Sequence, residues 1–103
     1  MANIHGTDGN DVPLPGTNES DVIWALGGDD EVYGGAGGDS IYLANGNDIA
    51  LGETGEDRIY GGDGADEIDG GTDDDHLYGE AGDDTLVGGS GDDWIEGGGG
   101  TDL

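Results

Sequence analysis

A hydrophobic residue recurs once every nine residues along most of this chain, a spacing that is neither helical nor alternating. Each lies in the middle of a three-residue segment, and in an extended strand its two neighbours would point the opposite way. The inward column consists of Ile23, Val32, Ile41, Ala50, Ile59, Ile68, Leu77, Leu86 and Ile95. The pattern predicts very short strands at 22–24, 31–33, 40–42, 49–51, 58–60, 67–69, 76–78, 85–87 and 94–96.

The six residues between successive strands are turn-forming and carry a second fixed column. An Asp precedes each inward residue by two positions, and Gly usually precedes that Asp by two more. Gly reaches positive φ at little cost, and Asp and Asn tolerate left-handed geometry. Strands this short cannot stand alone, so they must stack, with two repeats per coil and residues 18 apart above one another. We call the following the frame aspartates: Asp21, Asp30, Asp39, Asp48, Asp57, Asp66, Asp75, Asp84, Asp93 and Asp102.

The frame shifts near the N-terminus. Asp11 lies ten residues before Asp21, which indicates a one-residue insertion near residues 13–15 and puts Pro13 at the inward position. Pro lacks the amide donor that a central strand needs. We therefore expect residues 1–15 to form an irregular first repeat that acts as an N-terminal edge or cap, and residues 16–103 to form the regular stack. Because the chain stops in mid-repeat at Leu103, we expect a fragment of a longer protein, or self-association through that end.

Composition alone would place this chain among disordered proteins. It has 26 acidic residues, one basic residue (Arg58), a formal charge of −25 and only 31% hydrophobic residues. The inward column is too small to offset the backbone entropy of a Gly-rich chain, so either the chain is disordered or something outside the polypeptide supplies the missing folding energy. The charge disfavours nucleic acid and anionic membrane and favours cations. We find no apolar stretch that could span a bilayer and no N-terminal signal peptide.

Stacked coils would place the frame aspartates in two columns. Asp21, Asp39, Asp57, Asp75 and Asp93 form one column, and Asp30, Asp48, Asp66, Asp84 and Asp102 form the other. Carboxylates about 4.8 Å apart would repel strongly. Ca²⁺ suits the space between them because it takes 6–8 hard oxygen ligands in flexible geometry. The intervals between aspartates predict about eight ions, with a ninth if Asp11 pairs with Asp30.

Residues 61–69 (GGDGADEID) and 88–96 (GGSGDDWIE) read G-G-x-G-x-D-x-U-x, so the chain resembles the RTX (repeats-in-toxin) calcium-binding nonapeptide repeats. The resemblance implies an all-β, right-handed parallel β-roll, a β-helix solenoid. It also implies that each ion lies between vertically adjacent loops, where frame aspartates give carboxylates and backbone carbonyls complete the shell. The carbonyls that we expect to take part are those of Gly28, Gly37, Gly46, Gly55, Gly62, Gly64, Gly82, Gly89 and Gly91.

The same resemblance implies a role. RTX rolls stay unfolded at low calcium, fold outside the bacterial cell after type I secretion, and stabilise an attached exported domain. We therefore expect an extracellular calcium-binding module that is intrinsically disordered without calcium. The alternative is a calcium-rigidified adhesion or surface module that contacts a partner through an aromatic face.

The role of that aromatic face has two interpretations. Trp24, Tyr42, Tyr60 and Tyr78 are 18 residues apart and should form an outward, in-register aromatic ladder. It could stabilise the sheet by cross-strand stacking, or it could be an exposed stripe that contacts another domain, a second copy or a sugar. We expect Trp94, at the other outward position on that face, to extend such a stripe.

Several copies depart from the pattern. Glu19 and Asp73 replace Gly, so we expect weaker calcium binding at loops 16–21 and 70–75. Residues 25–26 and 43–44 replace the opening Gly pair of their loops. The small side chain of Ala50 in the inward column predicts a locally altered core. We expect the side chains of Asp29, Asp74, Asp83 and Asp92 to be solvated. Catalysis has no support, because the chain has no Cys, His5 and His76 are far apart in sequence, and no catalytic motif occurs. We therefore expect no enzyme.

Overall fold

Short strands make up all the regular structure in the computed structural model, which describes residues 3–10 and 14–100. Every strand from residue 22 onward occupies the three-residue segment that the sequence predicts. The strands are β1 (Asn3–His5), β2 (Leu14–Pro15), β3 (Val22–Trp24), β4 (Glu31–Tyr33), β5 (Ser40–Tyr42), β6 (Ile49–Leu51), β7 (Arg58–Tyr60), β8 (Glu67–Asp69), β9 (His76–Tyr78), β10 (Thr85–Val87) and β11 (Trp94–Glu96).

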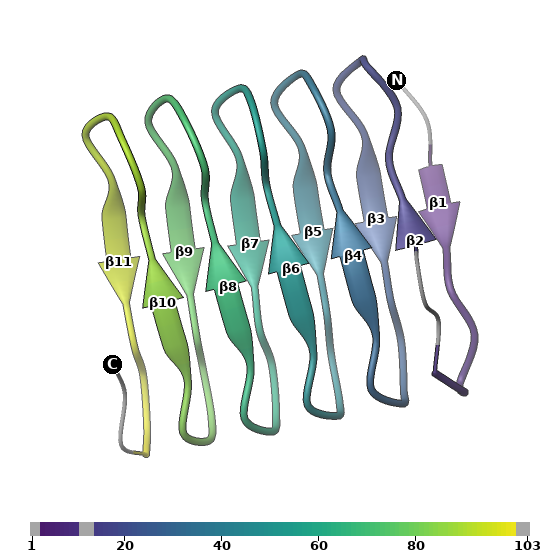
Figure 1. Ribbon diagram of the computed structural model, residues 1–103. Coiled ribbons are helices and arrows are strands. Elements are labelled where there is room, and N and C mark those ends of the chain that lie inside the picture. The colour runs from purple at the N-terminus through teal and green to yellow at the C-terminus, as the bar shows by residue number, and fades with distance from the viewer. Residues whose placement is uncertain (1–2, 11–13, 101–103) are drawn as a thin grey trace.

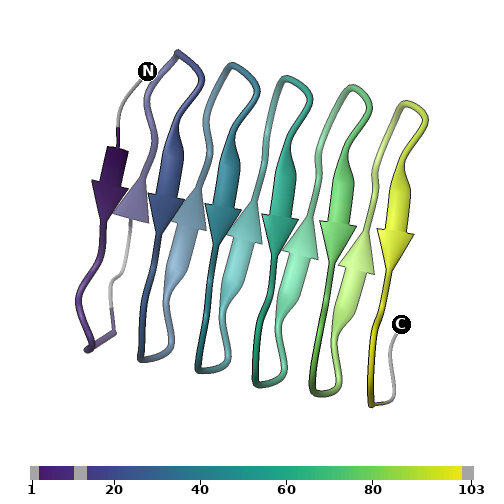
Figure 2. The ribbon, with the colours of Figure 1, turned by 180° about the vertical axis from the view of Figure 1, so that it is seen from behind.

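The chain winds as a flattened right-handed coil whose odd and even strands form two facing sheets (Figures 1 and 2). Sheet A has the order β1-β3-β5-β7-β9-β11 and sheet B the order β10-β8-β6-β4-β2, with every pair parallel. From β2 onward paired residues are 18 apart, as in Ile41↔Ile59 and Val32↔Ala50. The predicted two-repeat coil is therefore confirmed, as a solenoid of about five turns.

The core is a single layer of side chains between the two sheets. Members of the inward column from Ile23 to Leu77 are at most 2% exposed, and Leu86 is 8% exposed. The molecule measures 32 × 31 × 15 Å, so its short dimension leaves room for two facing rows of side chains and little else. Ala50 lies in this core at 1% exposure.

Three core positions differ from the sequence-based expectation. Leu14, rather than Pro13, pairs with Val32 in the inward column, so the insertion lies before Leu14; Pro13 itself lies outside the described residues. Ala25 and Leu43, which looked like defects in their loops, are fully buried core members. The first loop position points inward, because a Cβ on Gly34 would lie 3.4 Å from Ile41 Cδ1. An apolar residue there adds to the core instead of weakening it.

The loops share one backbone conformation. The second and fourth positions have positive φ in every loop from 25–30 to 88–93. At the second position this includes Leu26, Ala44, Glu53 and Glu80, and at the fourth it includes Asp73. Positive φ is costly for residues with a Cβ, so the stack imposes this conformation on sequences that would not choose it locally. Loop 16–21 is an exception, since neither Thr17 nor Glu19 has positive φ.

The aromatic ladder forms on the outer face of sheet A. Adjacent rings of Trp24, Tyr42, Tyr60 and Tyr78 have centroids 5.0–6.1 Å apart and lie within 13° of parallel. His5 extends it, stacking on Trp24 at 4.6 Å, which the 19-residue separation of the two hid from sequence reasoning. Trp94 lies in the neighbouring column opposite His76, and Glu96 follows Tyr78 in the ladder column. Trp94 is 57% exposed at this other outward position of the same face, where the sequence places it.

The ladder should stabilise the folded roll in proportion to the number of stacked neighbours. Tyr60→Ser removes two stacked pairs and Tyr78→Ser removes one. We expect losses in unfolding free energy of about 2 and about 1 kcal/mol, because a stacked pair contributes roughly 0.5–1.5 kcal/mol beyond area burial. Denaturant unfolding of both variants in saturating calcium measures this, and equal losses would show that stacking is not the cause.

Candidate metal sites between the coils

The frame aspartates sit at the start of each strand, facing the interior of the loops. Those from Asp21 to Asp84 are at most 2% exposed, while Asp93 is partly buried. Because each strand begins one residue after its aspartate, the parallel register places the carboxylates directly above one another, one column per edge of the roll. Asp102 and Asp11 lie outside the described residues, so their places in these columns stay predictions.

Each carboxylate ties its coil to the one before it. In all seven intervals between described frame aspartates, the backbone N–H of one donates to Oδ1 of the aspartate 18 residues later. The distances are 2.8–2.9 Å, which is short for an amide donor and typical of a charged acceptor. One carboxylate oxygen of each pair is therefore committed to the register of the stack.

The second oxygen of these carboxylates is different. Oδ2 is buried and accepts no hydrogen bond in Asp39, Asp48, Asp57, Asp66 and Asp75. It faces the first residue of its own loop, where a carbonyl from the next coil also approaches. A Cβ on Gly34 would lie 2.7 Å from Asp39 Oδ2 and 2.8 Å from the Gly52 carbonyl oxygen. At Gly61 the corresponding distances, to Asp66 Oδ2 and the Gly79 oxygen, are 2.6 and 2.7 Å.

Burial raises the pKa of these carboxyls well above the usual value. Desolvation is the largest cause, neighbouring aspartates of the column raise the pKa further, and the backbone hydrogen bond opposes both. The pKa rises to about 8 for Asp57 and Asp66, about 7 for Asp48, and about 6 for Asp39 and Asp75. The columns therefore carry negative charge near neutral pH only at a cost in free energy, unless a cation compensates it.

An all-oxygen pocket with buried carboxylates and converging carbonyls suits a hard divalent cation. Among the described residues, no cluster of three or more Asp, Glu or His side chains surrounds a single point. Carboxylates alone therefore cannot fill a calcium shell, and backbone carbonyls must supply the remaining oxygens. Residues 39 and 57, with the carbonyls of their loops, illustrate the donor set that each interval repeats.

The glycines that the sequence singled out lie at the second and fourth loop positions, between adjacent coils. A Cβ on Gly46 would collide with the Gly28 carbonyl oxygen, and one on Gly55 with that of Gly37, so these carbonyls point along the roll axis toward the next loop. Sequence reasoning missed the first loop position, represented by Gly34, Gly52 and Gly61, which lies closest to the free carboxylate oxygen. The opening Gly of the G-G pair was the available signal, because a side chain there would meet that oxygen.

Loop 16–21 holds its aspartate in another way. The Thr17 backbone N–H donates to Asp21 Oδ2 at 2.6 Å, and the Thr17 hydroxyl donates to the same carboxylate at 2.8–2.9 Å. The protein itself thus supplies donors to Asp21, whereas Oδ2 accepts no hydrogen bond in Asp39, Asp48, Asp57, Asp66 and Asp75. Loop 70–75 keeps the regular backbone, with Asp73 at φ 72°. The two irregular loops are therefore unlike each other, and their calcium affinities stay predictions.

A second set of acidic side chains takes part in the stacking. Asp29 Oδ1 accepts the backbone N–H of Asn47, and Asp74 Oδ1 accepts that of Asp92, both in the next coil. Asn47 Oδ1 accepts from Ala65 in the same manner. Asp29 and Asp74 are exposed, as the sequence predicts, but sequence reasoning missed that their carboxylates also join adjacent coils. The fifth loop position is a cap for the next loop, which the sequence indicates only by its preference for Asp and Asn.

Without divalent cations, acid should favour the fold. A carboxyl whose pKa is raised on folding contributes most stability below its unfolded pKa of about 3.9, and this contribution is lost as pH rises through the folded value. With folded pKa values of about 6 to 8, the loss falls between pH 4 and 8. We expect circular dichroism in chelator to show more β-structure at pH 4 than at pH 8.

The variant Asp57→Asn provides the control, because it removes one of the two highest pKa values. It should lessen the loss of β-structure between pH 6 and 8. A chelated chain whose β-signal is constant, or grows, from pH 4 to 8 would contradict the assigned burial of the columns.

Comparison with known proteins agrees with this geometry. Residues 15–50, 42–77 and 69–103 match the family model of the RTX calcium-binding nonapeptide repeat, which describes four copies. No curated protein matches the chain, and no solved structure does. Within residues 3–10 and 14–100 there is no helix of the length and apolarity needed to cross a membrane. The nine-residue frame, the parallel roll and the family match agree: this chain belongs to the RTX calcium-binding nonapeptide repeat family.

Proposed function

We propose that this calcium-binding domain folds when it binds Ca²⁺ and thereby supports secretion, folding and stability of an exported bacterial protein to which it is attached. The observation that supports this most is the pair of buried carboxylate columns, in which Asp39, Asp57 and Asp66 each have an Oδ2 atom that accepts no hydrogen bond. The repeat family is one of calcium binding rather than catalysis. The domain thus acts through its folding equilibrium.

The physical basis is that calcium removes the main cost of the fold. A buried, unpaired carboxylate is expensive, and here each one is stacked on others of its own sign. Eight divalent ions would lower the formal charge from −25 to about −9. At affinities typical of extracellular modules and millimolar calcium, each site contributes about 2 kcal/mol by mass action. The sum is comparable with the whole stability of a small domain.

The frame aspartates would hold the ions, together with loop carbonyls from the two adjacent coils. Seven intervals lie between described aspartates, and Asp102 would complete an eighth, with a ninth if Asp11 pairs with Asp30. Ca²⁺ supplies charge neutralisation and a tie between coils. The chain supplies preformed oxygens and, through the Asp N–H to Asp Oδ1 bonds, the spacing.

Secretion follows from the same equilibrium. In a low-calcium cytoplasm a Gly-rich chain of charge −25 would stay unfolded and could pass through a narrow export channel. Outside the cell, calcium would fold it and disfavour return. The proposal thus includes type I export, an extracellular location and an attached exported domain, and RTX repeats do occur in secreted bacterial proteins.

The adhesion alternative gains nothing from the aromatic ladder. Interior rings stack on both neighbours at 5.0–6.1 Å, so their faces are covered and only their edges and hydroxyls meet solvent. A sugar platform needs open ring faces. The geometry suits cross-strand stabilisation.

Calcium titration tests the proposed coupling. We expect the chelated chain at pH 7.5 to lack β-signal and to gain it cooperatively with Ca²⁺. Mg²⁺ at equal concentration should not replace Ca²⁺, because it demands a smaller octahedral shell and loses water reluctantly. Asp57→Asn, which touches two intervals, should raise the calcium midpoint at least about threefold.

Asp63→Asn is the matched control, since it removes the same charge from an exposed loop position. Its calcium midpoint should stay near that of the parent chain. Full β-structure in chelator, or equal shifts for both variants, would refute calcium-coupled folding through the columns.

The irregular loop gives a separate test. Thr17→Gly removes the hydroxyl that donates to Asp21 and permits positive φ at the second position. Isothermal titration calorimetry should then show tighter binding at one site, by about threefold, or one additional ion. Thr54→Gly, at the third position of loop 52–57, should bind calcium like the parent chain. Identical titrations for the two variants would mean that Thr17 does not limit this loop.

A further inference from the structure

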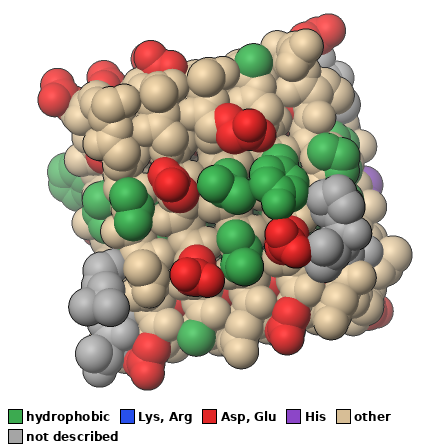
Figure 3. All heavy atoms as spheres, in the orientation of Figure 1, with side chains coloured by type: hydrophobic (Ala, Val, Ile, Leu, Met, Phe, Trp, Pro, Cys, Tyr) green, Lys and Arg blue, Asp and Glu red, His purple; other side chains and the backbone are tan. Residues whose placement is uncertain are grey.

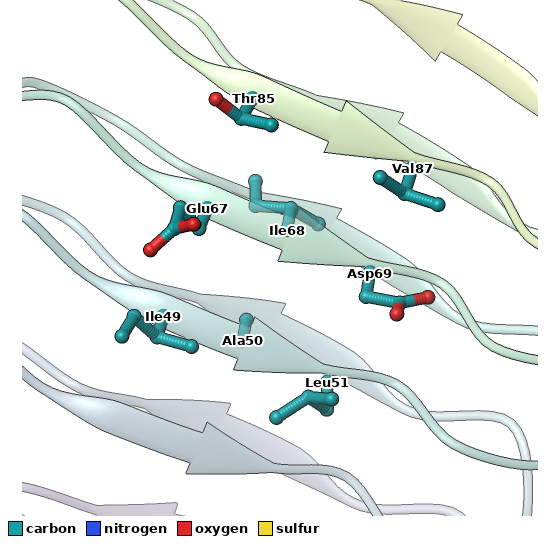
Figure 4. Close-up of a pocket in the computed structure, with 8 residues that line it drawn as sticks. All are labelled: Ile49, Ala50, Leu51, Glu67, Ile68, Asp69, Thr85 and Val87. Atoms are coloured by element: carbon teal, nitrogen blue, oxygen red, sulfur yellow. The ribbon is translucent and has the colours of Figure 1, made fainter.

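The outer face of sheet B contains a hollow that the calcium sites do not use (Figure 4). Its volume is about 210 Å³, and it crosses β6, β8 and β10 along the roll axis. The outward side chains that line it are Ile49, Leu51, Glu67, Asp69, Thr85 and Val87. Ile49 is 39% exposed and Val87 50% exposed, in a protein where few large apolar side chains reach solvent.

The lining alternates from strand to strand. The register places Glu67 between Ile49 and Thr85, and Asp69 between Leu51 and Val87. An aliphatic pair on β6 is thus followed by an acidic pair on β8 and by Thr85 and Val87 on β10. Figure 3 shows this face with hydrophobic and acidic side chains side by side and no basic side chain in view. The single Arg, Arg58, belongs to sheet A.

The charge pattern decides which occupant fits. A second copy would bring Glu67 and Asp69 of both chains into one interface, and like charges that lose solvent there repel. A partner with a basic side chain opposite β8 could instead pair with the carboxylates of Glu67 and Asp69, while its apolar side chains contact β6 and β10. Complementarity therefore favours a basic, partly apolar segment over self-association.

The spacing of the strands indicates the shape of that segment. Parallel strands are about 4.8 Å apart, so β6 and β10 are roughly 10 Å apart, with β8 midway. An α-helix rises about 5.4 Å per turn, so residues i and i+7 are about 10.5 Å apart and residue i+3 or i+4 lies between them. A helix along the roll axis could place apolar side chains on β6 and β10 and Lys or Arg on β8.

We propose that the outer face of sheet B binds a cationic amphipathic helix with apolar residues at i and i+7 and a basic residue between them. The three strands come together only in the folded roll, so binding requires calcium. In this respect the inference rests on the proposed function. The helix would lie in the hollow with its apolar side chains against β6 and β10. The ion pairs between its basic residue and the carboxylates of β8 would make the binding weaken as the salt concentration rises.

Fluorescence anisotropy tests the inference with the full chain and a labelled helical peptide that has two Leu seven residues apart and Lys midway. Val87→Ser should weaken binding about tenfold, because it removes an apolar contact. Glu67→Gln should weaken it about threefold and flatten its salt dependence. The matched controls on sheet A, Val22→Ser and Glu96→Gln, should bind like the parent chain.

A peptide isomer of identical composition, with Leu and Lys dispersed around the helix, separates site binding from general attraction to an anionic protein. Equal binding of the isomer, binding that persists in chelator, or no effect of Val87→Ser would overturn the inference. So would a dimer in sedimentation that Val87→Ser dissociates, because the occupant would then be a second copy. Circular dichroism of the same samples distinguishes the failures: a chain that folds with calcium but ignores the peptide refutes only this site.

Discussion

The fold depends on one contact, the hydrogen bond from the backbone N–H of each frame aspartate to the carboxylate one coil later. This contact sets the register of neighbouring coils and commits one carboxylate oxygen. It also draws the second oxygen out of water, next to others of its own charge, as the raised pKa values of Asp57 and Asp66 record. The residue that orders the stack is therefore the residue that makes it costly without a cation.

The thin core explains why this cost is decisive. Each strand contributes one inward side chain, and the roll is 15 Å through its short dimension. A larger core could absorb several unpaired buried carboxylates, whereas this one cannot. The loops add to the strain, because residues such as Leu26 and Glu53 are held at positive φ. The dependence on calcium that we propose would thus be a property of the architecture and would not need a separate switch.

Much of this could be predicted because a nine-residue frame leaves few alternatives. The strands from 22 onward, the 18-residue register and the two Asp columns follow from the phase of Ile41 and Asp39 and their equivalents. The buried positions of Ala25 and Leu43 were missed because the consensus glycine at the first loop position has no side chain to show which way that position points. Gly at the first loop position does not reveal that Leu43 would point inward. Around Pro13 two phases meet, and the sequence alone could not decide that Leu14 occupies the core.

The same nine-residue frame determines at which positions one coil can differ from another. Loop geometry and the frame aspartate constrain much of the six-residue loop, and the core constrains the eighth position, so the strand positions that vary freely are the seventh and ninth. On sheet A aromatic side chains occupy the ninth position and stack on one another, as Tyr42 and Tyr60 do. On sheet B the same positions alternate aliphatic and acidic side chains, as at Leu51 and Asp69, and leave them open. The frame aspartates recur from coil to coil, and we therefore expect any discrimination between partners to come from these outward columns.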